Sequence, residues 1–284
     1  MSRFIGVDLA WGEGTAARRA NETGLVLLDS GGTVLDAGWV RGIDAVAAWL
    51  IAAALPGDVI AIDAPMIVFN AVGMRECERE VGRRYGRWKV AANASSLKLG
   101  WLGGVTLRLT LEAAGFRYTD GAHPPAPDAI EFFECYPYTT LVGAAEFGYT
   151  VARPRYKRPA LALPAGERRA FRAAECDDLL QRMSALATVD PPLDLRSHPV
   201  TSALLESPSP LVDAAYKHRE DLLDAALCAW TAALWSRFGL ARCQVLGAGD
   251  PPDAAGRRPV IIAPARPEQR RDVRAPPDEA APTA

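Results

Sequence analysis

The chain has 284 residues, of which 49% are hydrophobic, and this content is ample for a large globular core. A formal net charge of −2 excludes a surface that is basic overall, so contact with nucleic acid would have to use a local basic patch. The five cysteines include no Cys-x-x-Cys pair, a pattern typical of free thiols in a reducing compartment rather than of a disulfide framework or zinc site.

Nothing at the start of the sequence has the pattern of a signal peptide. The longest apolar run, residues 45–55, is too short to cross a bilayer. We therefore expect a cytoplasmic protein that does not use a membrane as a partner.

The first quarter of the chain predicts four strands and one helix. In chain order these are a strand within residues 3–12, strands at 23–29 and 33–40, a helix at 43–54 and a strand at 59–63. Tight turns make the first three strands an antiparallel meander, whereas the helical crossover lets the fourth lie parallel to a neighbour. Asp8 and Asp63, in the first and fourth strands, would then lie side by side.

The rest of the chain predicts a fifth strand and several helices. The expected elements are helices at 97–114, 167–187 and 218–238, a strand at 130–135, and two short strands at 243–246 and 259–263. The fold class is therefore α/β, with a mixed five-stranded sheet flanked by helices. We expect one domain over residues 1–263, with helical insertions at about 66–96 and 138–215, and a disordered tail at 264–284.

Asp8 interrupts an apolar strand, where an ionised carboxylate is costly unless a cation or hydrogen bonds meet it. We expect a metal ion there, held jointly with acids from later in the sequence. Asp221 and Asp224 are candidates, because their i,i+3 spacing places both on one face of a helix. Small alanines after them would let that helix approach a sheet closely. The alternative is an acidic helix N-terminus, where carboxylates favour the helix dipole.

Together these acids resemble the RNase H-like superfamily, and the aspartate pair followed by alanines resembles its RuvC-type resolvase branch. More closely, five segments resemble the family called domain of unknown function 429, whose members are described as predicted RNase H-like nucleases. The segments are Gly6-Val7-Asp8, Asp63-Ala64-Pro65, Glu134-Cys135-Tyr136-Pro137, Tyr156-Lys157-Arg158-Pro159 and His218-Arg219-Glu220-Asp221-Leu222-Leu223-Asp224-Ala225. The resemblance spans residues 3 to about 263.

The resemblance implies a two-metal phosphodiesterase that uses two Mg²⁺ or Mn²⁺ ions and acts on nucleic acid. Carried over residue by residue, Asp8 would bridge both ions, Asp63 would bind one, and Asp221 or Asp224 the other. Carboxylate oxygens suit these hard cations. The resemblance does not say whether the substrate is DNA or RNA. It also leaves the oligomeric state open, a homodimer included.

Two further residues are candidate members of this site. His218 could orient water or protonate a leaving group, or it could be a solvated histidine at a helix start. Glu134 ends the fifth strand and could be a fifth acid, or it could pair with a nearby arginine.

Basic residues that could bind phosphate occur in two places. A four-residue repeat would align one cationic stripe along a helix, formed by Arg75, Arg79, Arg83 and Arg87. The alternative is a salt-bridged solvated face, because Glu76 and Glu80 lie at helical spacing from these arginines. Lys157 and Arg158 form a smaller basic site beside Tyr156. Trp11 could stack on a base or belong to the core.

Three functions remain open from the sequence. The first is a metal-dependent nuclease or phosphodiesterase. The second is a non-catalytic module of the same fold that binds nucleic acid or a partner through the arginine stripe. The third is an actin-like or sugar-kinase-like phosphotransferase, which would need a second phosphate-binding hairpin that the sequence does not display.

Overall fold

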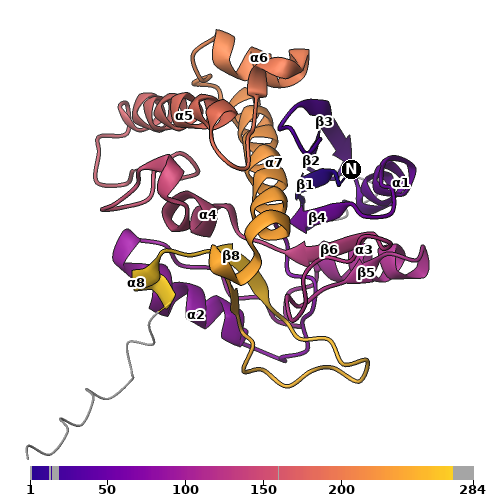
Figure 1. The fold of residues 1–284 in the computed structure, drawn as a ribbon. Coiled ribbons are helices and arrows are strands. Elements are labelled where there is room, and N and C mark those ends of the chain that lie inside the picture. Colours follow the sequence, from indigo (N-terminus) through magenta and orange to yellow (C-terminus); the bar gives the residue numbers. More distant parts are fainter. Residues whose placement is uncertain (1, 13, 15–18, 159, 271–284) are drawn as a thin grey trace, which may run out of the picture.

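The computed structural model describes residues 2–12, 14, 19–158 and 160–270, and its centre is a mixed six-stranded sheet with helices on both faces (Figure 1). The strand order is β3-β2-β1-β4-β6-β5. The strands are β1 (Phe4–Asp8), β2 (Glu22–Leu28), β3 (Val34–Arg41), β4 (Val59–Ile62), β5 (Arg117–Tyr118) and β6 (Glu131–Glu134). The predicted α/β class, antiparallel meander and parallel fourth strand are confirmed. The expected count of five strands is wrong because β5, only two residues long, has no recognisable pattern.

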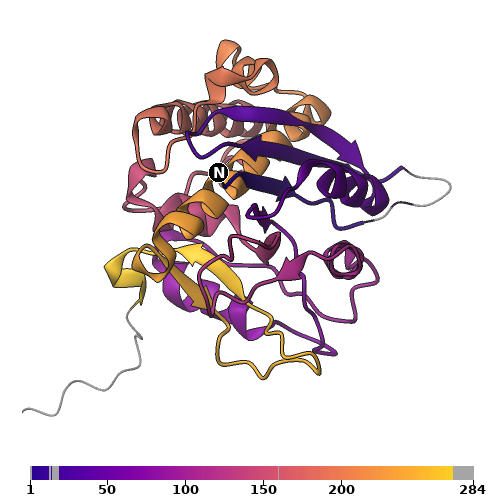
Figure 2. The same cartoon turned by 45° about the vertical axis from the view of Figure 1, so that its right-hand side comes forward.

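The helices lie in two layers around this sheet (Figures 1 and 2). They are α1 (Ile43–Ala53), α2 (Glu76–Tyr85), α3 (Gly103–Ala113), α4 (Pro137–Gly143), α5 (Arg168–Ser184), α6 (Pro199–Glu206), α7 (Asp213–Phe238) and α8 (Pro267–Arg270). Alternate residues of each central strand contribute to different cores. Ile5 and Val7 pack with residues of α1 and α3, whereas Phe4 packs with α7 and the other later helices.

Helix α7 lies almost directly on the backbone of β1 and β2, because glycines leave room for it. A Cβ atom added to Gly6 would lie 1.9 Å from the carbonyl oxygen of Ala225, and one added to Gly24 would lie 2.1 Å from that of Asp221. The close approach expected from the alanines of α7 is therefore present. It also depends on glycines in the facing strands.

The last long helix begins earlier than the sequence predicts. Helix α7 begins at Asp213 rather than near residue 218, so Asp221 and Asp224 lie more than two turns inside it. They are therefore not an acidic helix N-terminus. The insertion at 66–96 contains α2, and α4, α5 and α6 fall within or at the edge of 138–215.

The expected disordered tail starts too early. A second, antiparallel pair consists of β7 (Cys243–Leu246) and β8 (Ile261–Pro264), and α8 follows it. Gln269 in α8 is buried and donates to the carbonyl oxygen of Val142 at 3.0 Å, so residues 264–270 are folded. The rest of the predicted tail, 271–284, lies outside the described residues. None of the helices in the described ranges combines the length and apolar character needed to cross a membrane.

Candidate active site

The four predicted aspartates converge where the parallel strands β1 and β4 end beneath α7. Val7 is in register with Ile62, and the amide of Asp63 donates to the carbonyl oxygen of Val7 at 2.8 Å. Asp8 and Asp63 are therefore neighbours. Side chains alternate between the two faces of a sheet, and Val7 and Ile62 belong to the core on the α1 and α3 face, so Asp8 and Asp63 lie on the face covered by α7. The tight packing of α7 on β1 and β2 brings Asp221 and Asp224 to the same place.

Two lysine ammonium groups lie between these acids. Nζ of Lys157 is 2.8 Å from Asp224 Oδ2 and 3.6 Å from Asp63 Oδ2. Nζ of Lys217 is 2.5 Å from Asp221 Oδ1 and 4.0 Å from Asp8 Oδ2. Each lysine thus joins an acid of α7 to an acid at the end of a strand.

A fifth acid, Glu220, completes the group, with Oε1 3.1 Å from Nζ of Lys217. We call the five acids Asp8, Asp63, Glu220, Asp221 and Asp224 the carboxylate cluster. Tyr156 is fully buried and donates its hydroxyl to Asp224 Oδ1 at 2.6 Å. The site residues predicted from the sequence do not include Glu220, Lys217 or Tyr156. Lys217 and Glu220 lie four residues before Asp221 and Asp224, a helical spacing that could have identified both.

Negative charge exceeds positive charge in the carboxylate cluster, which has five acids and two lysines. Burial, and then repulsion from Asp8, raises the pKa of Asp221 to about 8. Burial raises the pKa of Asp63 to about 8 and that of Glu220 to about 7, although a lysine favours the charged form of each. Burial also raises the pKa of Asp224. The cluster therefore binds protons near neutral pH unless another cation replaces them.

The pKa values of the two lysines are raised as well, which for an ammonium group favours the charged form. Burial by itself would lower the pKa of Lys157, but the attraction of Asp224 and Asp63 raises this pKa well above its ordinary value. In the same way the acids around Lys217, Asp8 first among them, outweigh burial and raise its pKa. Both ammonium groups remain charged at physiological pH and hold the acids together.

The donor chemistry of the cluster suits Mg²⁺ or Mn²⁺, because every acid offers hard carboxylate oxygens. As the side chains stand, the described part of the chain contains no group of three or more His, Cys, Asp or Glu residues arranged to hold a metal ion. The lysines contact the same carboxylates that a metal ion would use. Metal binding by these acids therefore requires Lys157 and Lys217 to move.

Glu134 does not belong to this cluster, and the sheet register explains why. It pairs with Ile62, whose side chain belongs to the core on the α1 and α3 face, whereas Cys135 follows in step with Asp63. A shift of one residue along a strand moves a side chain to the other face. Glu134 is thus not an acid of the carboxylate cluster, which corrects the prediction. The alternative, that Glu134 pairs with a nearby arginine, is confirmed.

That arginine is Arg75, for which the sequence predicts a place in a phosphate-binding stripe. Its guanidinium donates to both oxygens of Glu134, at 2.8 and 2.6 Å, and to Glu78 Oε1 at 2.9 Å. All three side chains are buried. We call Arg75, Glu78 and Glu134 the arginine cluster. Arg75 is thus held by two buried acids and does not belong to an exposed stripe on α2.

The other predicted arginines of the stripe are exposed and largely paired along α2. Arg79 Nε lies 2.7 Å from Glu76 Oε2, Arg83 also contacts Glu76, and Arg87 lies over the ring of Trp88 at 5.4 Å from its centroid. The salt-bridged face considered as the alternative is therefore what the structure displays for α2.

His218 and Arg158 lie outside both the carboxylate cluster and the arginine cluster. His218 stacks on Trp39 with ring centroids 3.7 Å apart, and its Nδ1 lies 2.6 Å from Glu22 Oε2. These contacts engage its ring with β2 and β3 rather than with the aspartates. Arg158 is exposed and donates to Asn93 Oδ1 at 3.3 Å, which places it beside the pocket described next.

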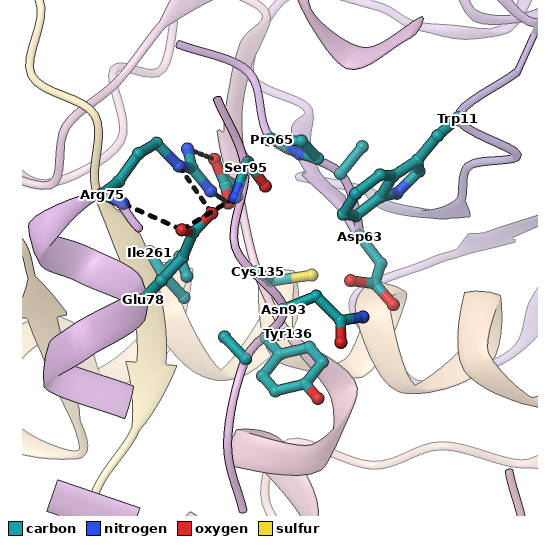
Figure 3. A pocket seen from close by; sticks show the side chains of 13 residues that line it. Trp11, Asp63, Pro65, Arg75, Glu78, Asn93, Ser95, Cys135, Tyr136 and Ile261 are labelled. Carbon is teal, nitrogen blue, oxygen red and sulfur yellow. Dashed lines mark hydrogen bonds and ion pairs between the residues drawn. The ribbon is translucent and has the colours of Figure 1, made fainter. Parts of the chain in front are cut away.

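A small pocket opens beside Asp63 (Figure 3). Trp11, Asn93 and Tyr136 line it together with Asp63, and the arginine cluster forms its opposite end. Trp11 is half-buried at this position. Solvent and small groups can therefore reach Asp63 between two aromatic rings.

Comparison of the chain with family models, with curated proteins and with solved structures finds no significant match.

Proposed function

We propose that the carboxylate cluster is the catalytic centre of a metal-dependent phosphodiesterase of RNase H-like topology that hydrolyses nucleic acid. The observation that carries the proposal is the excess of buried acids over lysines at the ends of two parallel strands. Strongly raised carboxyl pKa values mark candidate functional sites, because burying unmatched acids costs stability without a structural return.

Each of the four aspartates has a role that follows from its position. Asp8 lies between Asp63, the residue after β4, and Asp221 on α7, and this central place suits a ligand shared by two cations. Asp63 and Asp224, joined by Lys157, would hold one cation, and Asp221 the other. When bound, the cations would activate water and stabilise the leaving oxygen of a phosphodiester.

The remaining residues position these acids. Tyr156 fixes one oxygen of Asp224 through its hydrogen bond and leaves Oδ2 to the cation side, where Lys157 now lies. Lys157 and Lys217 can supply positive charge toward a phosphate once they leave the acids. The arginine stripe gives no comparable support to the non-catalytic alternative, since Arg75, Arg79 and Arg83 are engaged by nearby acids.

The test is a hydrolysis panel with Mg²⁺ and Mn²⁺ over single strands, duplexes, hybrids and branched junctions, run beside calorimetric titration with Mn²⁺. We expect Asp8→Asn and Asp221→Asn to lower the rate by about a hundredfold or more, because each removes a cation ligand. The matched control is Asp36→Asn, an exposed aspartate of the same sheet. Hydrolysis that survives both site variants would retract the proposal.

A further inference from the structure

A broad groove lies next to the candidate active site, between the segment that follows β1 and the segment that leads into α3. It has aromatic, cationic and polar side chains along its walls. The lining residues that matter here are Trp11, Arg19, Asn21, Trp101 and Thr106. The side chain of Trp101 is 55% exposed. An exposed tryptophan within a groove is more informative than a scattered apolar residue, since it offers a large flat face to a ligand.

The groove and the small pocket beside Asp63 share one lining residue. Trp11 lines the groove together with Trp101, and it also lines the small pocket that contains Asp63. Figure 3 shows Trp11 and Asp63 on the same side of that pocket. A chain that lies in the groove and passes over Trp11 would therefore bring its backbone to Asp63.

The packing around α3 fixes this arrangement. The amide of Gly103 donates to the carbonyl oxygen of Trp11 at 2.9 Å, and a Cβ atom at Gly103 would lie 2.5 Å from the same oxygen. A Cβ atom at Gly104 would lie 2.4 Å from the carbonyl oxygen of Pro65. The two glycines after Trp101 thus hold the backbone at Trp11 and at Pro65 against one helix end.

We propose that this groove binds the unpaired bases of a single-stranded nucleic acid, with Trp101 and Trp11 as stacking platforms and Arg19 beside the phosphates. Stacking on an aromatic ring needs a free base face, which a single strand offers and a duplex conceals. Arg19 lines the same groove and supplies the positive charge that a phosphate backbone needs. The inference rests on the proposed function and names its substrate class.

The test is fluorescence anisotropy with a labelled oligo(dT) of about twelve nucleotides, in EDTA so that no hydrolysis occurs. Oligo(U) of the same length distinguishes RNA from DNA, and a blunt duplex is the competitor. We expect Trp101→Ala to weaken single-strand binding about tenfold, and Trp101→Phe to retain most of it because a ring remains. Phe69→Ala is the matched control, since Phe69 is 47% exposed on a different loop. We expect it to bind as the wild type does.

Two results would overturn the inference: equal single-strand affinity of the Trp101→Ala variant and the wild type, or a duplex that binds as tightly as the single strand. Circular dichroism and a melting curve for each variant separate lost binding from lost folding. The proposed function fails independently. Binding of oligo(dT) that depends on Trp101, without metal-dependent hydrolysis of any phosphodiester, would retract catalysis and support the groove.

Discussion

The carboxylate cluster and the arginine cluster both bury acids near the same pocket, yet they neutralise them in different ways. In the arginine cluster a single guanidinium reaches two acids, and backbone amides supply the rest: those of Arg75 and Ser95 donate to Glu78, and that of Met66 to Glu134. In the carboxylate cluster five acids meet two ammonium groups and one phenol. Hydrogen bonds satisfy the two acids of the arginine cluster, although burial still raises the pKa of Glu134. The carboxylate cluster has a larger excess of acids over cations, so it needs further cations or protons.

The largest expected effect comes from removing the guanidinium of the arginine cluster. Arg75→Met leaves Glu78 and Glu134 buried without a cation, so the free energy of unfolding should fall by about 3–5 kcal/mol. Urea denaturation measures it. Arg79→Met makes the same change at an exposed position of the neighbouring turn and should cost less than about 1 kcal/mol. Equal losses in the two variants would show that Arg75 is not a structural centre.

Removing one acid from the carboxylate cluster should raise the free energy of unfolding instead of lowering it. In the folded protein the pKa of Asp221 is raised to about 8, whereas its ordinary value is 3.8, so the folded state binds more protons between these values. The stability contributed by this proton is complete below about pH 4 and is lost as the pH rises through 8. Asp221→Asn should therefore be more stable than the wild type at pH 8 in EDTA, by about 1–3 kcal/mol.

Thermal melts of the wild type and Asp221→Asn between pH 5 and about 8.5 test this prediction, with Asp36→Asn as the control for a lost surface charge. The difference in melting temperature should grow with pH. Mn²⁺ should stabilise the wild type most at the alkaline end, because ionised acids bind it best. A variant that is less stable than the wild type throughout would contradict the excess of negative charge.

The smallest effects are expected on the arginine stripe. Arg79→Ala with Arg83→Ala removes side chains that are paired with Glu76, so affinity for oligo(dT) should change less than about twofold. Anisotropy measures it in the same buffer as the groove variants. Loss of binding here, with acid-to-amide variants unaffected, would instead favour the non-catalytic binding module.

The sequence predicted the parts of the site that depend on local pattern and on one topological rule. Asp8 and Asp63 were placed together because a helical crossover makes β4 parallel to β1, and the register of Val7 with Ile62 agrees. Asp221 and Asp224 were placed on one helix face by their spacing. The small residues of α7 indicated its close approach, which the glycines of β1 and β2 complete.

What the sequence could not predict depends on a single residue of register or on distant packing. Glu134 looked equivalent to Asp63 because both end strands, but the pairing of β4 with β6 puts Glu134 on the opposite face. Lys157 and Tyr156 lie in a loop between α4 and α5, and only the packing of that loop brings them to Asp224. Arg75 shares its spacing with exposed arginines, although its side chain alone is buried among them.

The contact of α7 with the glycines of β1 and β2 has a consequence for motion. With backbone packed on backbone, the amide hydrogens of β1 and of the middle of α7 should exchange with solvent only when the whole domain opens. Trp11 and Trp101 lie in loops, whose amides should exchange earlier. The acids would then remain fixed on the slowest-exchanging unit while the aromatic rings beside them adjust to whatever strand arrives.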